Sequence, residues 1–255
     1  MIMPKPIILA FCGKGGVGKT SISALSVRLL HEAHPDKKIL AIDADPAIGL
    51  ATALGVNSSS TVDDIRKLFI EHAENGESKA ALEILSEAKY QIFDALVEID
   101  NISFLAIGRP EASGCYCKVN AYLKEVISLL ANNFDYVVID GEAGIEQVNR
   151  RVMEKVTHLV LVSDASKKGI EVTKTIKKVA NELVMYETDG LILNRVNETV
   201  DVSKLNLDSL NLLSVIPDDK EMMLSDVEGN SVFSLNKEAS IVKNTKLALE
   251  KLGIL

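Results

Sequence analysis

The chain has 255 residues, with 28 basic and 36 acidic side chains and a formal net charge of −8. Its hydrophobic content of 47% and charged content of 25% allow a large buried core, which excludes disorder as the main state. The negative charge argues against nucleic acid bound through a broad basic face. No run approaches the ~20 apolar residues that span a bilayer, so we expect no membrane partner.

The three cysteines are too few for a disulfide framework. The apolar residues 1–12 form a short run that leads directly into glycines and a lysine, so they do not resemble a signal peptide. We therefore expect a cytoplasmic protein, in which thiols stay reduced and can bind metal.

Short apolar runs alternate with amphipathic stretches along the chain. The runs typical of buried strands are residues 6–11, 38–43, 102–107, 134–140, 158–163, 190–194 and 212–216. Residues 119–130 carry apolar side chains at the spacing of one helix face. Residues 57–60 and 74–79 are polar and are predicted as loops. This alternation predicts an α/β doubly wound, mostly parallel sheet of about seven or eight strands with helices on both faces, in one domain over residues 1–255.

A glycine-rich motif follows the first predicted strand. Residues 13–20 read Gly-Lys-Gly-Gly-Val-Gly-Lys-Thr and fit G-x-x-x-x-G-K-[ST], with a strand before and a helix after. Glycines allow backbone N–H groups to face phosphate oxygens, and the helix presents its positive end to the same charge. Lys19 would reach the β- and γ-phosphates, and the Thr20 hydroxyl would ligate Mg²⁺. The predicted phosphate-binding residues are Gly13, Lys14, Gly15, Gly16, Val17, Gly18, Lys19, Thr20 and Ser21.

Lys14, directly after the first glycine, is not needed by an ordinary phosphate loop. With it, the motif resembles the deviant Walker A motif of the MinD/ParA and nitrogenase-iron-protein superfamily of dimeric ATPases, which predicts the P-loop NTPase fold. The resemblance implies that Lys14 crosses a dimer interface and acts on the partner's nucleotide, like an arginine finger. A solvated loop lysine is the simpler alternative.

Two carboxylates follow the second predicted strand, in Asp43-Ala44-Asp45-Pro46. They lie at the carboxyl edge of the sheet, where α/β proteins bind ligands. The resemblance identifies this segment as switch I, in which Asp45 orients the attacking water and Asp43 lies near Mg²⁺. Termination of a strand by polar residues is the alternative.

The strand over residues 134–139 runs into Asp140-Gly141-Glu142-Ala143-Gly144. An aspartate after a run of apolar residues is the Walker B arrangement, in which Asp140 would hold Mg²⁺ through water. The resemblance implies that Gly144 is the switch II glycine whose N–H senses the γ-phosphate. Catalysis would then rest on Lys14, Lys19 and Asp45 around the magnesium nucleotide.

A later strand ends in Asn194, which by resemblance contacts adenine, and Arg195 follows it. A guanine-binding motif of N-K-x-D type would have an aspartate at the position of Asn197. A carboxylate can accept two N–H bonds from guanine, whereas the asparagine amide has only one acceptor oxygen. ATP is therefore favoured over GTP. Pro217, in residues 215–219, matches the family's last strand and the loop near the base. An edge strand and a turn are the alternative here.

Cys115 and Cys117 form a Cys-x-Cys pair in Gly114-Cys115-Tyr116-Cys117. The strain of so small a ring disfavours a disulfide between them, whereas a reduced pair can bind a soft or borderline metal. One chain supplies two thiolates and a closed site needs four ligands, so a two-fold axis would supply the others. Two unrelated thiols are the alternative. Together with Lys14, the pair predicts a symmetric homodimer.

With these motifs nearly the whole chain resembles the CooC-type maturation ATPases of carbon monoxide dehydrogenase. The resemblance implies a homodimer bound through ATP, with Ni²⁺ or Zn²⁺ held by Cys115 and Cys117 of both chains. Hydrolysis would change the dimer geometry and release the metal to a nickel-enzyme client of the carbon monoxide dehydrogenase type.

Two other functions stay open at this point. Four thiolates across a dimer can hold a [4Fe–4S] cluster, as in an electron-transfer ATPase resembling the nitrogenase iron protein. Residues 141–145 lack the cysteine that this family places there. The other function is a MinD/ParA-like positioning switch on DNA or membrane, which the negative charge of the chain disfavours. The amphipathic residues 240–255 are predicted as a packed helix rather than an anchor.

Overall fold

The computed structural model describes residues 5–75, 78–108, 117–142, 145, 148 and 152–255. It contains one eight-stranded sheet with the order β3-β4-β2-β5-β1-β6-β7-β8. Neighbouring strands are parallel, except that β3 and β4 are antiparallel. The strands are β1 (Ile7–Gly13), β2 (Ile39–Asp43), β3 (Val97–Ile99), β4 (Ile102–Ala106), β5 (Tyr136–Asp140), β6 (His158–Ser163), β7 (Thr188–Val196) and β8 (Leu212–Pro217). The predicted α/β class and mostly parallel sheet are confirmed.

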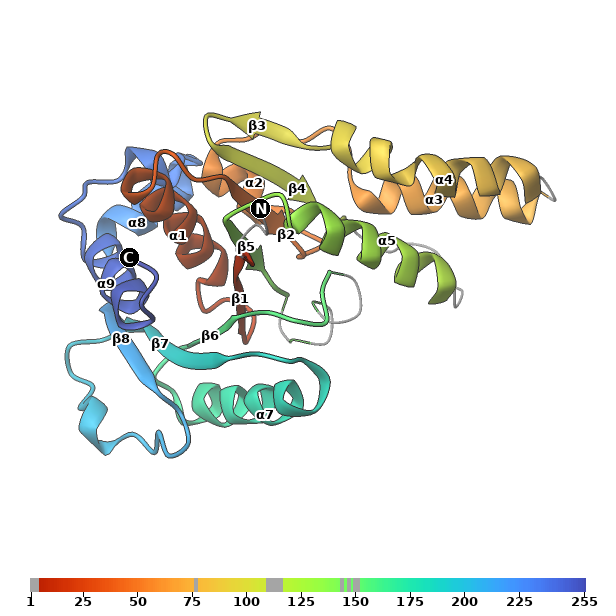
Figure 1. Ribbon diagram of the computed structural model, residues 1–255. Helices are drawn as coiled ribbons and strands as arrows, with labels where there is room; N and C mark the ends of the chain where they lie inside the picture. Colours follow the sequence, from red (N-terminus) through yellow and green to blue (C-terminus); the bar gives the residue numbers. More distant parts are fainter. Residues whose placement is uncertain (1–4, 76–77, 109–116, 143–144, 146–147, 149–151) are drawn as a thin grey trace.

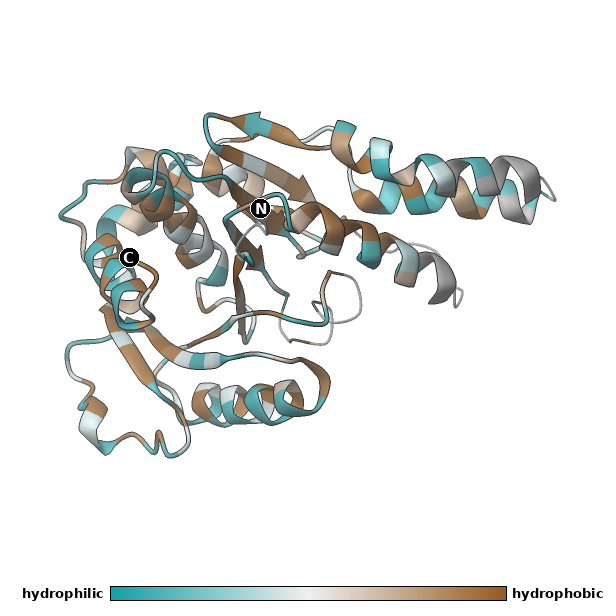
Figure 2. Ribbon diagram, in the orientation of Figure 1, coloured by the Kyte–Doolittle hydropathy of each residue, from teal (hydrophilic) through white to brown (hydrophobic). Residues whose placement is uncertain are grey.

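Helices cover both faces of this sheet (Figure 1). They are α1 (Lys19–Ala33), α2 (Gly49–Leu54), α3 (Val62–Glu74), α4 (Ser78–Asp94), α5 (Cys117–Ala131), α7 (Lys167–Leu183), α8 (Lys220–Glu228) and α9 (Ser240–Lys251), with 3-10 turns η1 (Val202–Lys204) and η2 (Val232–Ser234). Alternate residues of one strand serve opposite faces: Leu9 and Phe11 pack with α1, α2 and α9, whereas Ala10 and Cys12 pack with α3, α4, α5 and α7. Figure 2 shows mostly apolar residues in the central strands, as burial on both faces requires, whereas β3 and β7 also carry hydrophilic residues.

Two features of the fold differ from the sequence prediction. The strand β3 was not predicted: it has three residues, is mostly exposed, and pairs with β4 only at the sheet edge. It lacks a run of apolar residues, because an edge strand has little to bury. The predicted loop over residues 74–79 was wrong in part, since Glu74 ends α3 and Ser78 and Lys79 begin α4.

The helices α3 and α4 lie side by side and extend away from the sheet (Figure 1). Glutamate and lysine, such as Glu74 and Lys79, form helices readily although they are polar, so their polarity alone does not distinguish a loop from a helix end.

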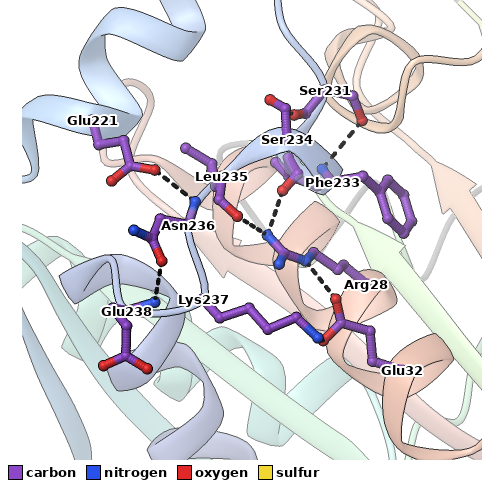
Figure 3. A network of polar contacts seen from close by, with 11 residues as sticks. Arg28, Glu32, Glu221, Ser231, Phe233, Ser234, Leu235, Asn236, Lys237 and Glu238 are labelled. Carbon is purple, nitrogen blue, oxygen red and sulfur yellow. Dashed lines mark hydrogen bonds and ion pairs between the residues drawn. The ribbon is translucent and has the colours of Figure 1, made fainter.

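Arg28 of α1 fixes the segment that connects α8 to α9. This guanidinium is buried and donates hydrogen bonds to the backbone oxygens of Val232 (2.7 Å) and Leu235 (2.9 Å) (Figure 3). Its Nε also donates to Glu32 at 3.0 Å. A buried guanidinium is stabilising only when it is paired in this way. The contact therefore anchors the segment between α8 and α9 against α1.

The parallel strands end at one edge of the sheet. In the register of the sheet, Asp140 at the end of β5 is the partner of both Phe11 of β1 and Asp43 of β2. On the other side of β1, Gly13 is paired with Val162 of β6. The residues after these strands therefore meet at this edge. In the described part of the chain, no helix is both long enough and apolar enough to cross a membrane.

Candidate functional site

The loop between β1 and α1 takes a conformation that its glycines permit. Gly16 and Gly18 have φ angles of 81° and 88°, in the left-handed region that favours glycine. Gly13 is needed for space, because a Cβ there would lie 2.0 Å from the backbone oxygen of Val162. The loop then leads into α1, whose first turn has no side-chain cap. Its N–H groups are therefore available to an anion.

A cavity of about 440 Å³ lies beside this loop. Its lining residues are Gly15, Gly16, Gly18, Lys19, Thr20, Asp45, Glu142 and Arg195. The Lys19 side chain is buried and its Nζ donates to the Lys14 backbone oxygen at 3.3 Å. A buried ammonium beside loop N–H groups and a helix N-terminus is an arrangement that can hold phosphate. Lys19, Thr20 and Asp45 thus line the same cavity.

Asp43 is fully buried and organises the turn that carries Asp45. Its Oδ1 accepts the N–H of Asp45 at 3.0 Å, and its Oδ2 accepts the N–H of Leu50 at 2.8 Å. Burial and the neighbouring Asp140 raise the pKa of Asp43 to about 7, although these two backbone N–H groups lower it. This carboxylate therefore does more than end a strand, since it fixes the backbone beside the cavity.

Asp140 is also fully buried, and its two oxygens differ in their partners. Ser23 of α1 donates to Oδ1 at 3.1 Å, whereas Oδ2 has no hydrogen-bond partner among the described residues. Burial raises the pKa of Asp140 to about 6, against the Thr20 and Ser23 side chains and the Lys19 charge, which lower it. A buried carboxylate oxygen without a partner is costly, and a hydrated Mg²⁺ would satisfy it. The oxygen donors of Asp140, Thr20 and Asp43 fit Mg²⁺, which prefers such ligands.

Lys14, a predicted catalytic residue, does not line this cavity. It is absent from the described residues that line the cavity, and its Nζ lies 3.6 Å from Oδ2 of Asp164, just after β6. The side chains of Lys14 and Asp164 are 39% and 34% exposed. Lys14 therefore faces an acidic residue of its own chain.

A second cavity of about 560 Å³ lies beside α8. Three residues predicted near the base, Asn194, Arg195 and Pro217, line this cavity. The other lining residues are Ser21, Asp218, Asp219, Lys220, Met222, Met223, Asp226, Val227 and Ile241. Asn194 donates from Nδ2 to the Val17 oxygen at 2.9 Å, and Arg195 donates to the Gly16 oxygen at 3.0 Å. Arg195 lines both cavities. The end of β7 therefore connects the two cavities to the glycine-rich loop.

Three further residues of the site were not predicted: Ser23, which contacts Asp140, and Glu142 and Asp219, which line the two cavities. Ser23 lies four residues after Lys19, one helix turn further along the same face, so helix periodicity could have found it. Asp219 caps α8 by accepting the N–H groups of Glu221 (3.0 Å) and Met222 (3.1 Å). An aspartate just before a helix is the usual signal of such a cap. Glu142 carried no comparable signal.

Some predicted site residues lie outside the part of the chain that the structure describes. Gly144 and Cys115 lie outside the described residues, and of Cys117 only the backbone is described, as the first residue of α5. Across the described ranges, no group of three or more histidine, cysteine, aspartate or glutamate residues is placed to hold a metal ion. The third cysteine, Cys12, is fully buried in β1, as expected of a small apolar side chain.

Known proteins resemble this chain over nearly its whole length. The AAA_31 family, described as an AAA domain, matches residues 5–189. An uncharacterized ATP-binding protein of Methanocaldococcus jannaschii is 38% identical over 251 residues, which cover 96% of this chain and 98% of that protein. The carbon monoxide dehydrogenase accessory protein CooC of Rhodospirillum rubrum is 29% identical over 258 residues, 96% of this chain and 97% of that protein.

A solved structure of the septum site-determining protein MinD with Mg-ADP, from Pyrococcus horikoshii, has the same fold. Its TM-score is 0.69 at 23% identity, and the match covers 96% of each chain. The chain therefore belongs to the AAA_31 family, as a P-loop ATPase that shares the fold of MinD.

Proposed function

We propose that this ATPase is a metallochaperone: a homodimer bridged by ATP, built from one ATPase domain per chain, that binds Ni²⁺ or Zn²⁺ and delivers nickel to an enzyme of the carbon monoxide dehydrogenase type. The observation that carries the proposal is the similarity to CooC over nearly the full length of both chains. The Cys115 and Cys117 pair adds to it, because thiolates are suitable ligands for these metals.

The phosphate groups of ATP would lie in the 440 Å³ cavity. Lys19 and the N-terminus of α1 would neutralise their charge, with Gly144 adding an N–H. Thr20, Asp140 and Asp43 would hold Mg²⁺, which supplies further positive charge at the phosphates when it is bound. Asp45 lines the same cavity and would orient the attacking water. Lys14 of the partner subunit would add a further positive charge to the phosphates in this cavity.

The base would lie in the 560 Å³ cavity beside Asn194. The Asn194 amide nitrogen is engaged by the Val17 oxygen, so its Oδ1 is the atom best placed to meet a base. An acceptor oxygen suits the exocyclic amine of adenine and repels the keto oxygen of guanine. This supports ATP over GTP as the substrate.

Metal binding by the purified chain tests the proposal. Equilibrium dialysis against Ni²⁺ should give about one ion per two chains, because four thiolates make one closed site. Cys115→Ala with Cys117→Ala should abolish this binding. Cys12→Ala is the matched control and should leave it intact, since Cys12 is buried in β1. Tight nickel binding by the Cys115/Cys117 variant would overturn the proposal, and iron in a brown, anaerobically purified protein would favour the electron-transfer function.

The second candidate function is a MinD/ParA-like positioning switch. The similarity to MinD of Thermotoga maritima, 28% identical over 252 residues, favours it. Co-sedimentation with liposomes or DNA in the presence of ATP separates the two functions. ATP-dependent sedimentation without any metal binding would support the switch.

A further inference from the structure

The contact between Lys14 and Asp164 joins the glycine-rich loop to the end of β6. Gly13 is paired with Val162 in the sheet, so the residues that follow them, Lys14 and Asp164 among them, lie close together. The Lys14 Nζ is 3.6 Å from Asp164 Oδ2. The ammonium is therefore attracted away from the cavity that Lys19 and Thr20 line.

Asp164 is held in place by its neighbours. Its Oδ1 accepts hydrogen bonds from the Ser166 N–H at 3.0 Å and from the Ser166 hydroxyl. Ser166 in turn caps α7, since its Oγ accepts the Gly169 N–H at 2.9 Å. Gly169 leaves the necessary space, because a Cβ there would lie 2.2 Å from Asp164 Oδ1. One carboxylate oxygen is thus used by the α7 cap, and the other faces Lys14.

The charge state of Asp164 supports this division. Partial burial acts to raise the pKa of Asp164, but the hydrogen bonds from Ser166 and the charge of Lys14 outweigh it and the pKa is lowered. The carboxylate is therefore ionised at neutral pH. A partly exposed ion pair of this kind adds little to the stability of the fold. The ion pair instead determines the position of the Lys14 side chain.

We propose that Asp164 is a positioning residue that keeps Lys14 on its own subunit until the partner's nucleotide attracts it. This inference rests on the proposed function, in which Lys14 acts across a dimer. Each subunit must break one Lys14–Asp164 pair to give its lysine to the partner. A triphosphate carries more negative charge than a single carboxylate and can compete for the lysine, whereas subunits without nucleotide have nothing to replace the pair. The pair therefore opposes dimers that form without ATP.

Asp164→Asn tests this inference, because asparagine keeps an oxygen for Ser166 and removes the charge. Sedimentation velocity of the full chain, with Mg²⁺ and a non-hydrolysable ATP analogue, gives the dimer dissociation constant. Two pairs are broken per dimer, so this constant should fall between roughly twofold and thirtyfold in the variant. The kcat at saturating protein concentration should not change, because the pair is already broken in the complete dimer.

Three further variants separate this effect from a general change of charge. Lys37 and Asp135 form a matched pair elsewhere, with Nζ 3.3 Å from Oδ1, side chains 44% and 33% exposed, and Oδ2 accepting a backbone N–H. Asp135→Asn should leave dimerisation unchanged. Asp164→Glu, which keeps the charge, should resemble the wild type more closely than Asp164→Asn. In a chain that already carries Lys14→Ala, Asp164→Asn should have no effect on dimerisation.

An unchanged or weaker dimer in Asp164→Asn would overturn the inference, and so would an equal gain in the Lys14→Ala chain. Asp164→Ser provides a second neutral variant if the asparagine protein does not fold. A different result would reject the proposed function itself: a Lys14→Ala chain that dimerises and hydrolyses ATP like the wild type. The two failures are thus distinguished by the same set of proteins.

Discussion

Asp43 and Asp140 lie opposite each other on neighbouring strands, and both are fully buried. Water cannot screen their charges, and each ionised carboxylate disfavours the ionisation of the other. Burial is the main reason why their pKa values rise to about 7 and about 6. The folded protein without Mg²⁺ therefore holds protons that the unfolded chain has already released.

This proton uptake predicts how the stability of the metal-free protein depends on pH. Since burial raises the folded pKa values from 3.8 to about 7 and about 6, the free energy of unfolding should decrease as the pH rises from about 4 to about 7. Asp140→Asn removes one of the two carboxylates, so thermal unfolding in EDTA should show a smaller decrease over this range. Addition of Mg²⁺ with ADP should also reduce the decrease in the wild type. Equal pH slopes in the two proteins would contradict this account.

The element between β1 and α1 depends on two different properties of glycine. Gly13 must lack a Cβ because its neighbour in the sheet, Val162, is too close. Gly15 has no atom within 4 Å of an added Cβ, and it lines the phosphate cavity. One glycine therefore serves the packing of β1 on β6, and the other faces the space for the nucleotide.

The two alanine variants should separate these properties. Gly13→Ala should lower the free energy of unfolding by more than about 2 kcal/mol, because the strands must move apart. Gly15→Ala is the matched control, and its unfolding temperature without nucleotide should equal that of the wild type. Circular dichroism melting curves measure both. If the two variants melt alike, the close approach of Gly13 to Val162 is not a constraint on the fold.

At the scale of elements, the sequence predicted seven of the strands because burial on both sheet faces requires continuous apolar runs, as in β5. It could not predict β3, whose pairing with β4 depends on a nearby edge and not on its own composition. The residues around Glu74 and Ser78 belong to helices and not to a loop, because polar residues such as glutamate and lysine also favour helices.

In the single chain, Lys14 is separated from the phosphate cavity. Lys19, Thr20 and Asp45 line the cavity, whereas Lys14 lies outside it. If a second subunit supplies Lys14, hydrolysis must depend on association. The specific ATPase activity should therefore increase with protein concentration and level off once the dimer is complete.

Phosphate release measured over a wide range of protein concentration tests this dependence. Lys14→Ala should reduce the activity at the plateau by roughly a hundredfold or more, as expected when a charge that stabilises the transition state is removed. Its melting temperature should stay close to that of the wild type, because the Lys14–Asp164 pair is partly exposed. A specific activity that is constant at all concentrations would show that a single subunit is sufficient.

The sequence alone determined the fold class and the identity of the phosphate loop, because both are written in local patterns: apolar runs of strand length, and glycines with Lys19 and Thr20 at fixed spacing. The tertiary structure decided which distant residues meet. Ser23 contacts Asp140 and Asp164 lies against Lys14 because β1 has β5 on one side and β6 on the other. Asn194 reaches Val17 from β7, which is separated from β1 by β6. Such contacts depend on strand order, and no short stretch of sequence contains that order.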